Sequence, residues 1–106
     1  MLSQNIQKIL PLLQSELRKQ PIRKAWLFGS CSRGEERADS DIDILVQYDE
    51  NTTITLFTIS HIMCELEEAV GHPVDLIEDG CLSPFAVESA NRDKILIYER
   101  PQQRQN

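Results

Sequence analysis

The 106-residue chain lacks the features that mark several large classes of protein. Its three cysteines, Cys31, Cys64 and Cys81, are widely spaced and form no CxxC pair. An odd number of cysteines at such spacing argues against a disulfide framework or a structural zinc site and favours a reducing compartment. Polar residues interrupt every apolar run of the N-terminus, so we expect neither a signal peptide nor a membrane-spanning helix there. A cytoplasmic location follows as the expectation.

Basic residues are outnumbered by acidic ones. The chain carries 17 acidic and 11 basic residues, for a formal net charge of -6. Because duplex nucleic acid is bound through clustered Lys and Arg, we expect no broad DNA-binding surface. An acidic chain can still bind a small phosphate ligand if metal ions lie between the two sets of negative charge. The two histidines, His61 and His72, have no neighbouring ligands in the sequence, and we interpret both as structural.

What the sequence does contain is a regular alternation of helical and strand patterns. Ser3 is placed to cap a first helix, in which Pro11 predicts either a kink or a later start. Further helices are expected at residues 30–37, 53–70 and 84–91, and strands at residues 23–28, 41–48, 72–78 and 94–99. This order predicts a single α/β domain over residues 1–100, a polar disordered tail over 101–106, and no second domain to hold a substrate.

The longest predicted helix, residues 53–70, carries two expectations about packing. Its core stripe is predicted to contain five apolar residues, namely Phe57, Ile62, Met63, Leu66 and Val70. Cys64 is expected to pack on the same apolar surface, because a free cysteine is usually buried. Gly71 is placed to end the helix, and Ser83 with Pro84 to open the last one.

Residues 29–46, GSCSRGEERADSDIDILV, hold two aspartates inside a predicted strand, where aspartate is depleted. Two phosphate- and metal-binding motifs fit only half of this stretch. Gly29 and Gly34 have the spacing of a P-loop, but Glu35 and Glu36 stand where it requires Lys and Ser or Thr. The P-loop is therefore excluded.

A calcium loop fails as well. Asp39, Asp41, Asp43 and Glu50 have the spacing of EF-hand ligands, but the position that must be glycine is Ile44. A hydrophobic strand follows directly, where a solvated ligand loop is needed. The calcium-loop interpretation is therefore a poor one.

A third interpretation uses the whole stretch. Residues two apart in a strand project from one face, so Asp41 and Asp43 can point toward a common Mg²⁺ site. The glycine–serine turn ahead of them offers backbone N–H groups to an anion, and Asp75 in the next strand is a third candidate carboxylate. The alternative is that these acids only solvate an edge strand. Agreement among the separate signals favours a site.

The arrangement resembles that of the nucleotidyltransferase superfamily that includes DNA polymerase β. Its minimal members carry GS-x-[AS]-RG followed by S-D-[IL]-D-[IL], which match residues 29–34 and 40–44 here, and a third acid matching Asp75. The resemblance covers about residues 3–100, including the closing ILIYE. It implies a small mixed β-sheet of about four strands with helices packed mainly on one face.

The resemblance also implies a reaction, the transfer of AMP from Mg-ATP to a hydroxyl with release of pyrophosphate. Asp41, Asp43 and Asp75 would be the catalytic residues and would bind two Mg²⁺ ions. The implied nucleotide-binding residues are Gly29, Ser30, Arg33 and Ser40. Arg33 can bind phosphate or pair with Glu35, Glu36 or Asp39 to order the loop, and both roles stay open.

Minimal nucleotidyltransferases often act as antitoxins beside a HEPN-domain toxin and can transfer AMP to a tyrosine of that toxin. The resemblance therefore implies a HEPN-domain protein as partner and acceptor, in a complex or oligomer of unspecified size. Two alternatives stay open. The chain could neutralise its partner by contact alone, or it could transfer AMP to a small molecule or an RNA end.

Overall fold

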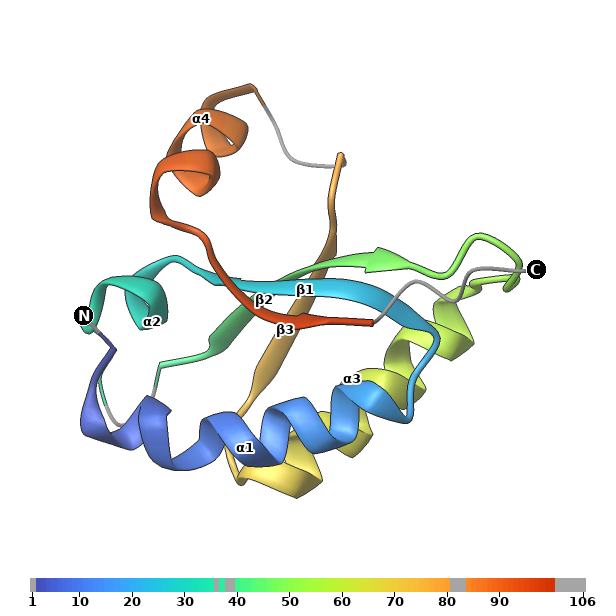
Figure 1. The fold of residues 1–106 in the computed structure, drawn as a ribbon, viewed down its shortest axis with the longest axis horizontal. Helices are drawn as coiled ribbons and strands as arrows, with labels where there is room; N and C mark the ends of the chain where they lie inside the picture. The colour runs from blue at the N-terminus through green and yellow to red at the C-terminus, as the bar shows by residue number, and fades with distance from the viewer. Residues whose placement is uncertain (1, 36, 38–39, 81–83, 101–106) are drawn as a thin grey trace.

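Helices and strands alternate along the whole chain in the computed structural model, which describes residues 2–35, 37, 40–80 and 84–100 (Figure 1). The elements are α1 (Gln4–Arg18), β1 (Ile22–Phe28), α2 (Ser30–Arg33), β2 (Ile42–Tyr48), α3 (Leu56–Val70), β3 (Val74–Glu78), α4 (Pro84–Asp93) and β4 (Ile95–Glu99). The predicted order is confirmed. Cys81, Ser83 and the tail 101–106 lie outside the described residues, and the extent of the domain stays a prediction.

Local capping explains where the two long helices begin. The backbone N–H of Ile6 donates to Ser3 Oγ (3.2 Å), which confirms the predicted cap of α1. The helix runs through Pro11, so the predicted later start is wrong. Pro11 has no N–H to donate, so one carbonyl in the preceding turn lacks its helical hydrogen bond. Because Pro11 is exposed, that carbonyl can bond water instead. Helix α3 begins at Leu56, later than predicted, because Thr55 caps it through a reciprocal hydrogen-bond pair with Thr58.

The four strands form one mixed sheet in the order β3-β2-β1-β4. Strand β1 is antiparallel to both β2 and β4, whereas β2 and β3 are parallel. This confirms the mixed four-stranded sheet that the resemblance implied. Because β2 is an inner strand, the interpretation of its aspartate as a solvated edge residue is wrong.

Helices α1 and α3 lie together on one face of the sheet, whereas α4 lies on the other side (Figure 1). The core fills the space between the sheet and these two helices. Its fully buried members from β2 are Ile42, Ile44 and Val46, and Leu13, Leu17, Ile62 and Leu66 pack on them from the helices. The helices therefore cover mainly one face of the sheet, as expected.

Two predictions about the packing of α3 are wrong. The buried residues Ile62, Leu66 and Val70 recur every four positions and define the face that meets the sheet. Phe57 lies five residues before Ile62 and is 88% exposed. Cys64 lies two residues after Ile62 and is exposed as well. Both positions fall outside the buried stripe because of the 3.6-residue period of the helix. Gly71 ends α3 with φ +72°, as predicted.

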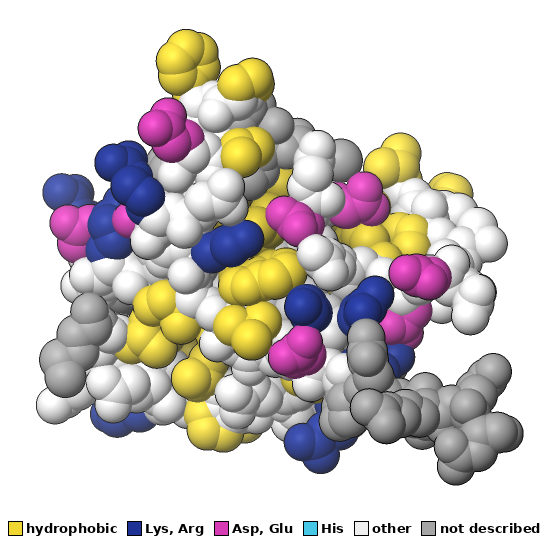
Figure 2. Space-filling model, turned by 45° about the horizontal axis from the view of Figure 1, so that its top comes forward, with side chains coloured by type: hydrophobic (Ala, Val, Ile, Leu, Met, Phe, Trp, Pro, Cys, Tyr) yellow, Lys and Arg dark blue, Asp and Glu magenta, His cyan; other side chains and the backbone are white. Residues whose placement is uncertain are grey.

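The opposite face of the sheet carries a different set of side chains. Trp26 pairs with Leu45 of β2 and Leu96 of β4, and the Nζ atom of Lys94 lies 4.8 Å from the Trp26 ring centroid. Leu45 is buried and Leu96 is 48% exposed. Figure 2 shows hydrophobic side chains on α4 and in a patch below it, with charged side chains around them. We call this side of the sheet the open face.

Within the described ranges, no helix combines the length and the apolar character needed to cross a membrane.

Candidate active site

The directions of three strands bring the candidate residues to one end of the sheet. Strand β1 ends at Phe28, which pairs with Asp43 near the start of antiparallel β2. Strand β3 runs parallel to β2, and Asp75 pairs with Asp43. Paired residues project from the same face, so both aspartates lie on the open face. The structure thus brings together two carboxylates that are 32 positions apart in the sequence.

Asp41 is placed differently from its prediction. It was expected inside the strand, but β2 begins at Ile42 and Asp41 is an exposed residue just ahead of it. Its backbone carbonyl accepts a hydrogen bond from the Cys31 Sγ (3.6 Å). Asp41 therefore joins the start of β2 to the turn that follows β1.

That turn, residues 29–34, contains the single helical turn α2 and is called the Gly29 turn below. Gly29 enters it with φ +72° and ψ -150°, a conformation that is essentially restricted to glycine. Gly34 closes it in the left-handed region with φ +73°. Inside the turn, the buried Ser32 donates its hydroxyl hydrogen to the Gly29 carbonyl (2.8 Å). Local chemistry thus fixes the predicted glycine–serine turn.

Gly29 is also required because of the aspartate beside it. A Cβ atom added to Gly29 would lie 2.8 Å from Asp43 Oδ2, closer than real Cβ atoms approach another heavy atom. The Asp43 carboxylate therefore lies directly against the backbone of the Gly29 turn. The two halves of the stretch 29–46 meet at this contact.

The surroundings of Asp43 disfavour the charged form of its carboxyl group. Burial raises the pKa of the Asp43 carboxyl above its usual range, and the neighbouring charges of Asp75 and Asp41 raise it further. Across the described part of the chain, none of these three carboxylates forms an ion pair with Lys, Arg or His. A bound cation would relieve this repulsion.

The donor set fits Mg²⁺, which takes hard oxygen ligands. The described residues include no group of three or more His, Cys, Asp or Glu side chains gathered closely enough to hold a metal by themselves. Mg²⁺ is usually held by one or two carboxylates together with substrate phosphates, and a complete protein cage is not needed. The Asp43–Asp75 pair, with Asp41 next to it, meets that lesser requirement.

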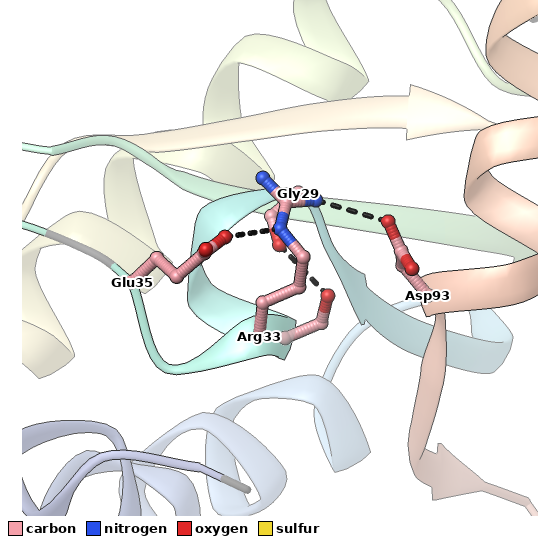
Figure 3. Close-up of polar contacts among 5 residues, drawn as sticks. Gly29, Arg33, Glu35 and Asp93 are labelled. Atoms are coloured by element: carbon pink, nitrogen blue, oxygen red, sulfur yellow. Dashed lines mark hydrogen bonds and ion pairs between the residues drawn. The ribbon is translucent and has the colours of Figure 1, made fainter.

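The remaining predicted residues also lie around the turn. Arg33, the last residue of α2, pairs with Glu35 and, through Nη1, with Asp93 Oδ2 at 3.0 Å (Figure 3). Glu35 was an expected partner, whereas Glu36 and Asp39 lie outside the described residues. Nothing in the sequence pointed to Asp93, which is 60 positions from Arg33.

Ser40 stands just ahead of the acids. Its Oγ accepts a hydrogen bond from the backbone N–H of Arg37 (2.8 Å), which closes the loop leading to Asp41. Ile44 is fully buried in the core, which is incompatible with a solvated calcium loop at this point.

Carboxylates that lie close enough to hold metal ions together are suited to the displacement of phosphate-containing groups, because the metals stabilise the attacking and leaving oxygens. The family model described as polymerase beta, nucleotidyltransferase matches residues 7–103. The chain therefore belongs to the polymerase beta nucleotidyltransferase family. The predicted recognition and the predicted enzyme class, nucleotidyltransferase, are confirmed.

Individual proteins place the chain among the minimal members. The protein adenylyltransferase MntA of Thermococcus cleftensis is 32% identical over 95 residues, which cover 89% of this chain and 94% of the relative. A chain in the crystal structure of a toxin–antitoxin complex with AMP-PNP superposes with a TM-score of 0.72 at 22% identity, over 86% of this chain and 73% of that one.

The third comparison is with a chain in the complex between the tri-AMPylated HEPN toxin of Shewanella oneidensis and its MNT antitoxin. It has a TM-score of 0.58 at 23% identity, and covers 91% of this chain and 71% of the other. At these identities both solved structures show the shared fold, which agrees with the sheet described above.

Proposed function

We propose that the chain is the antitoxin of a toxin–antitoxin pair and transfers AMP from ATP to a hydroxyl of a HEPN-domain partner protein. The observation that carries this proposal is the Asp43–Asp75 pair, held on the open face directly against the Gly29 turn. The names of the relatives, a protein adenylyltransferase and AMPylated or AMP-PNP-containing toxin–antitoxin complexes, support the donor and the partner.

In this proposal each predicted residue keeps its role. Asp41, Asp43 and Asp75 would hold two Mg²⁺ ions, and the metals would make the acceptor hydroxyl more acidic and neutralise charge on the triphosphate. Gly29 and Ser30 receive the β- and γ-phosphates at the Gly29 turn. Arg33 adds a positive charge at the end of the same turn. Ser40, in the loop before Asp41, is the fourth nucleotide-binding residue of the proposal. These assignments are predictions, as is a cytoplasmic location.

The open face supports an acceptor that belongs to another protein. Helices α1 and α3 cover the other face of the sheet. The acids lie on the open face, where hydrophobic side chains are exposed (Figure 2), and Leu96 of β4 and Phe85 of α4 are among the exposed hydrophobic residues. A tyrosine or other hydroxyl of a partner can approach the aspartates from this side. The partner in the proposal is a HEPN-domain protein, as in the complexes to which the chain is similar.

The test uses ATP labelled at either of two positions. The purified chain is incubated with the HEPN-domain protein, Mg²⁺ and ATP labelled on the α- or the γ-phosphate. We expect label on the partner from α-labelled ATP alone, and none after removal of Mg²⁺ with EDTA.

Other outcomes assign other activities. Label from γ-labelled ATP would indicate phosphorylation and contradict the proposal. Label from neither, with the toxin still neutralised, would indicate neutralisation by contact. Label that enters an aminoglycoside or an RNA end, but not the protein, would identify a different acceptor.

A further inference from the structure

The Gly29 turn is fastened to the rest of the molecule on two sides. On one side, the Cys31 thiol bonds the carbonyl of Asp41, which leads into β2. On the other side, Arg33 reaches α4. A one-turn helix has almost no stability of its own, because helix formation needs several turns to offset nucleation. The orientation of α2 therefore depends on such contacts with its surroundings.

The contact with α4 is an ion pair with defined geometry. Arg33 Nε pairs with Glu35, and Arg33 Nη1 lies 3.0 Å from Asp93 Oδ2 (Figure 3). Asp93 is the last residue of α4, and the next residue, Lys94, lies over the ring of Trp26 in β1. The junction between α4 and β4 is thus anchored both to the Gly29 turn and to the sheet.

The two carboxylates fix the guanidinium plane without using all of its donors. A guanidinium has five N–H donors in a rigid fork, and the two pairs seen among the described residues use two of them. The others can bond the oxygen atoms of a phosphate while Glu35 and Asp93 stay in place. Arg33 is therefore oriented before a ligand arrives, which lowers the cost of binding.

We propose that Asp93 is a positioning residue for the nucleotide: it orients Arg33 toward the triphosphate and acts only through Arg33. The inference rests on the proposed function, since it assumes that the triphosphate binds at the Gly29 turn. Asp93 is not a catalytic residue in this proposal, because among the described residues its side chain pairs with Arg33 only, and it lies on a separate helix.

The charge of Asp93 and its contact with Arg33 predict opposite effects on nucleotide binding when Asp93 is replaced. By charge alone, the loss of a carboxylate should strengthen the binding of an anionic ligand. If Asp93 positions Arg33, binding should weaken instead, by the amount expected of one exposed ion pair, about two- to fivefold in Kd. The direction of the change therefore separates the two effects.

The experiment measures the Kd of Mg-AMP-PNP by isothermal titration calorimetry on the full chain. The variants are Asp93→Asn, Arg33→Gln and the double variant, with Glu88→Gln as matched control. Glu88 is an exposed acid on the same helix, so its replacement changes the net charge equally. Far-UV circular dichroism establishes that each variant is folded, and Arg33→Gln tests the same contact from its other end.

We expect Asp93→Asn to raise the Kd about two- to fivefold and Glu88→Gln to leave it unchanged or lower it. In the Arg33→Gln background, where only the charge effect remains, Asp93→Asn should likewise leave the Kd unchanged or lower it. An unchanged or lower Kd for Asp93→Asn would overturn the proposal. A further increase in the Arg33→Gln background would overturn it too, because Asp93 would then act independently of Arg33.

The result for Asp93 can be distinguished from the result of the test of the proposed function. If the unsubstituted chain binds AMP-PNP but transfers no AMP to its partner, the proposed function fails, and the Kd values still decide the role of Asp93. If the unsubstituted chain does not bind AMP-PNP at all, the positioning role is overturned.

Discussion

The two faces of strand β2 contrast within five consecutive residues. Ile42, Ile44 and Val46 point into the core, where all three are at least 98% buried beneath α1 and α3. Asp43 and Leu45 point to the open face, where Asp43 lies among other carboxylates. The first face stabilises the fold. The second holds a charge that burial and like charges make unfavourable, as is common where a site is built for a ligand.

Replacing a residue on the covered face should have the largest effect on stability. Ile44→Ala removes a fully buried side chain between the sheet and both long helices, and should cost about 2–5 kcal/mol of unfolding free energy. Urea unfolding followed by circular dichroism measures this loss. A loss below about 1 kcal/mol would mean that this face is not the tightly packed one.

The second test compares two glycines that have the same φ of +72°. Gly29→Ala should cost about 1–3 kcal/mol and should also displace the Asp43 carboxylate, so that AMP transfer falls at least about tenfold. Gly71→Ala meets nothing within 4 Å and should lower stability without changing transfer. The measurements are urea unfolding and the initial rate of label transfer.

Equal activities of the two alanine variants would contradict the close contact between the Gly29 turn and Asp43. The comparison is informative because both variants carry a strained backbone, whereas only one of them has a carboxylate in the way.

The smallest expected effect concerns stability as a function of pH. Because the pKa of Asp43 is raised in the folded state, that state binds more protons than the unfolded chain in the pH range just above the ordinary carboxyl pKa of about 4. The charged carboxylate therefore costs stability at pH 7, and this cost disappears as the pH falls below that range.

Asp43→Asn should accordingly be more stable than the unsubstituted chain at pH 7, with a difference that shrinks toward pH 4. Urea midpoints at several pH values in metal-free buffer measure it. A variant that is less stable at pH 7 would show that Asp43 has a structural role.

Much of this organisation could be predicted from the sequence because it depends on local chemistry. Ser3 and Gly71 bound their helices through caps that involve only near neighbours. The pairing of Asp43 with Asp75 follows from strand alternation once the two strands are adjacent and parallel. The Gly29 turn was predictable as well, because the glycines at its two ends can adopt the positive φ angles that it requires.

The rest depends on tertiary contacts that a local pattern does not encode. Phe57 and Cys64 were wrongly placed in the core, because the helical phase is fixed by which residues meet the sheet. The Arg33–Asp93 pair joins residues 60 positions apart, which meet because the end of α4 lies beside the Gly29 turn.

The most direct test of the account is the rate of AMP transfer to the HEPN-domain partner by Asp43→Asn. Glu99→Gln is the matched control, because Glu99 is an acid of the same sheet that pairs with Lys24 away from the aspartates. With both variants folded and Mg-ATP saturating, Asp43→Asn should be at least about a hundredfold slower than the unsubstituted chain, and Glu99→Gln within about twofold of it. Undiminished transfer by Asp43→Asn would contradict the central claim that the acids of the open face carry out the reaction.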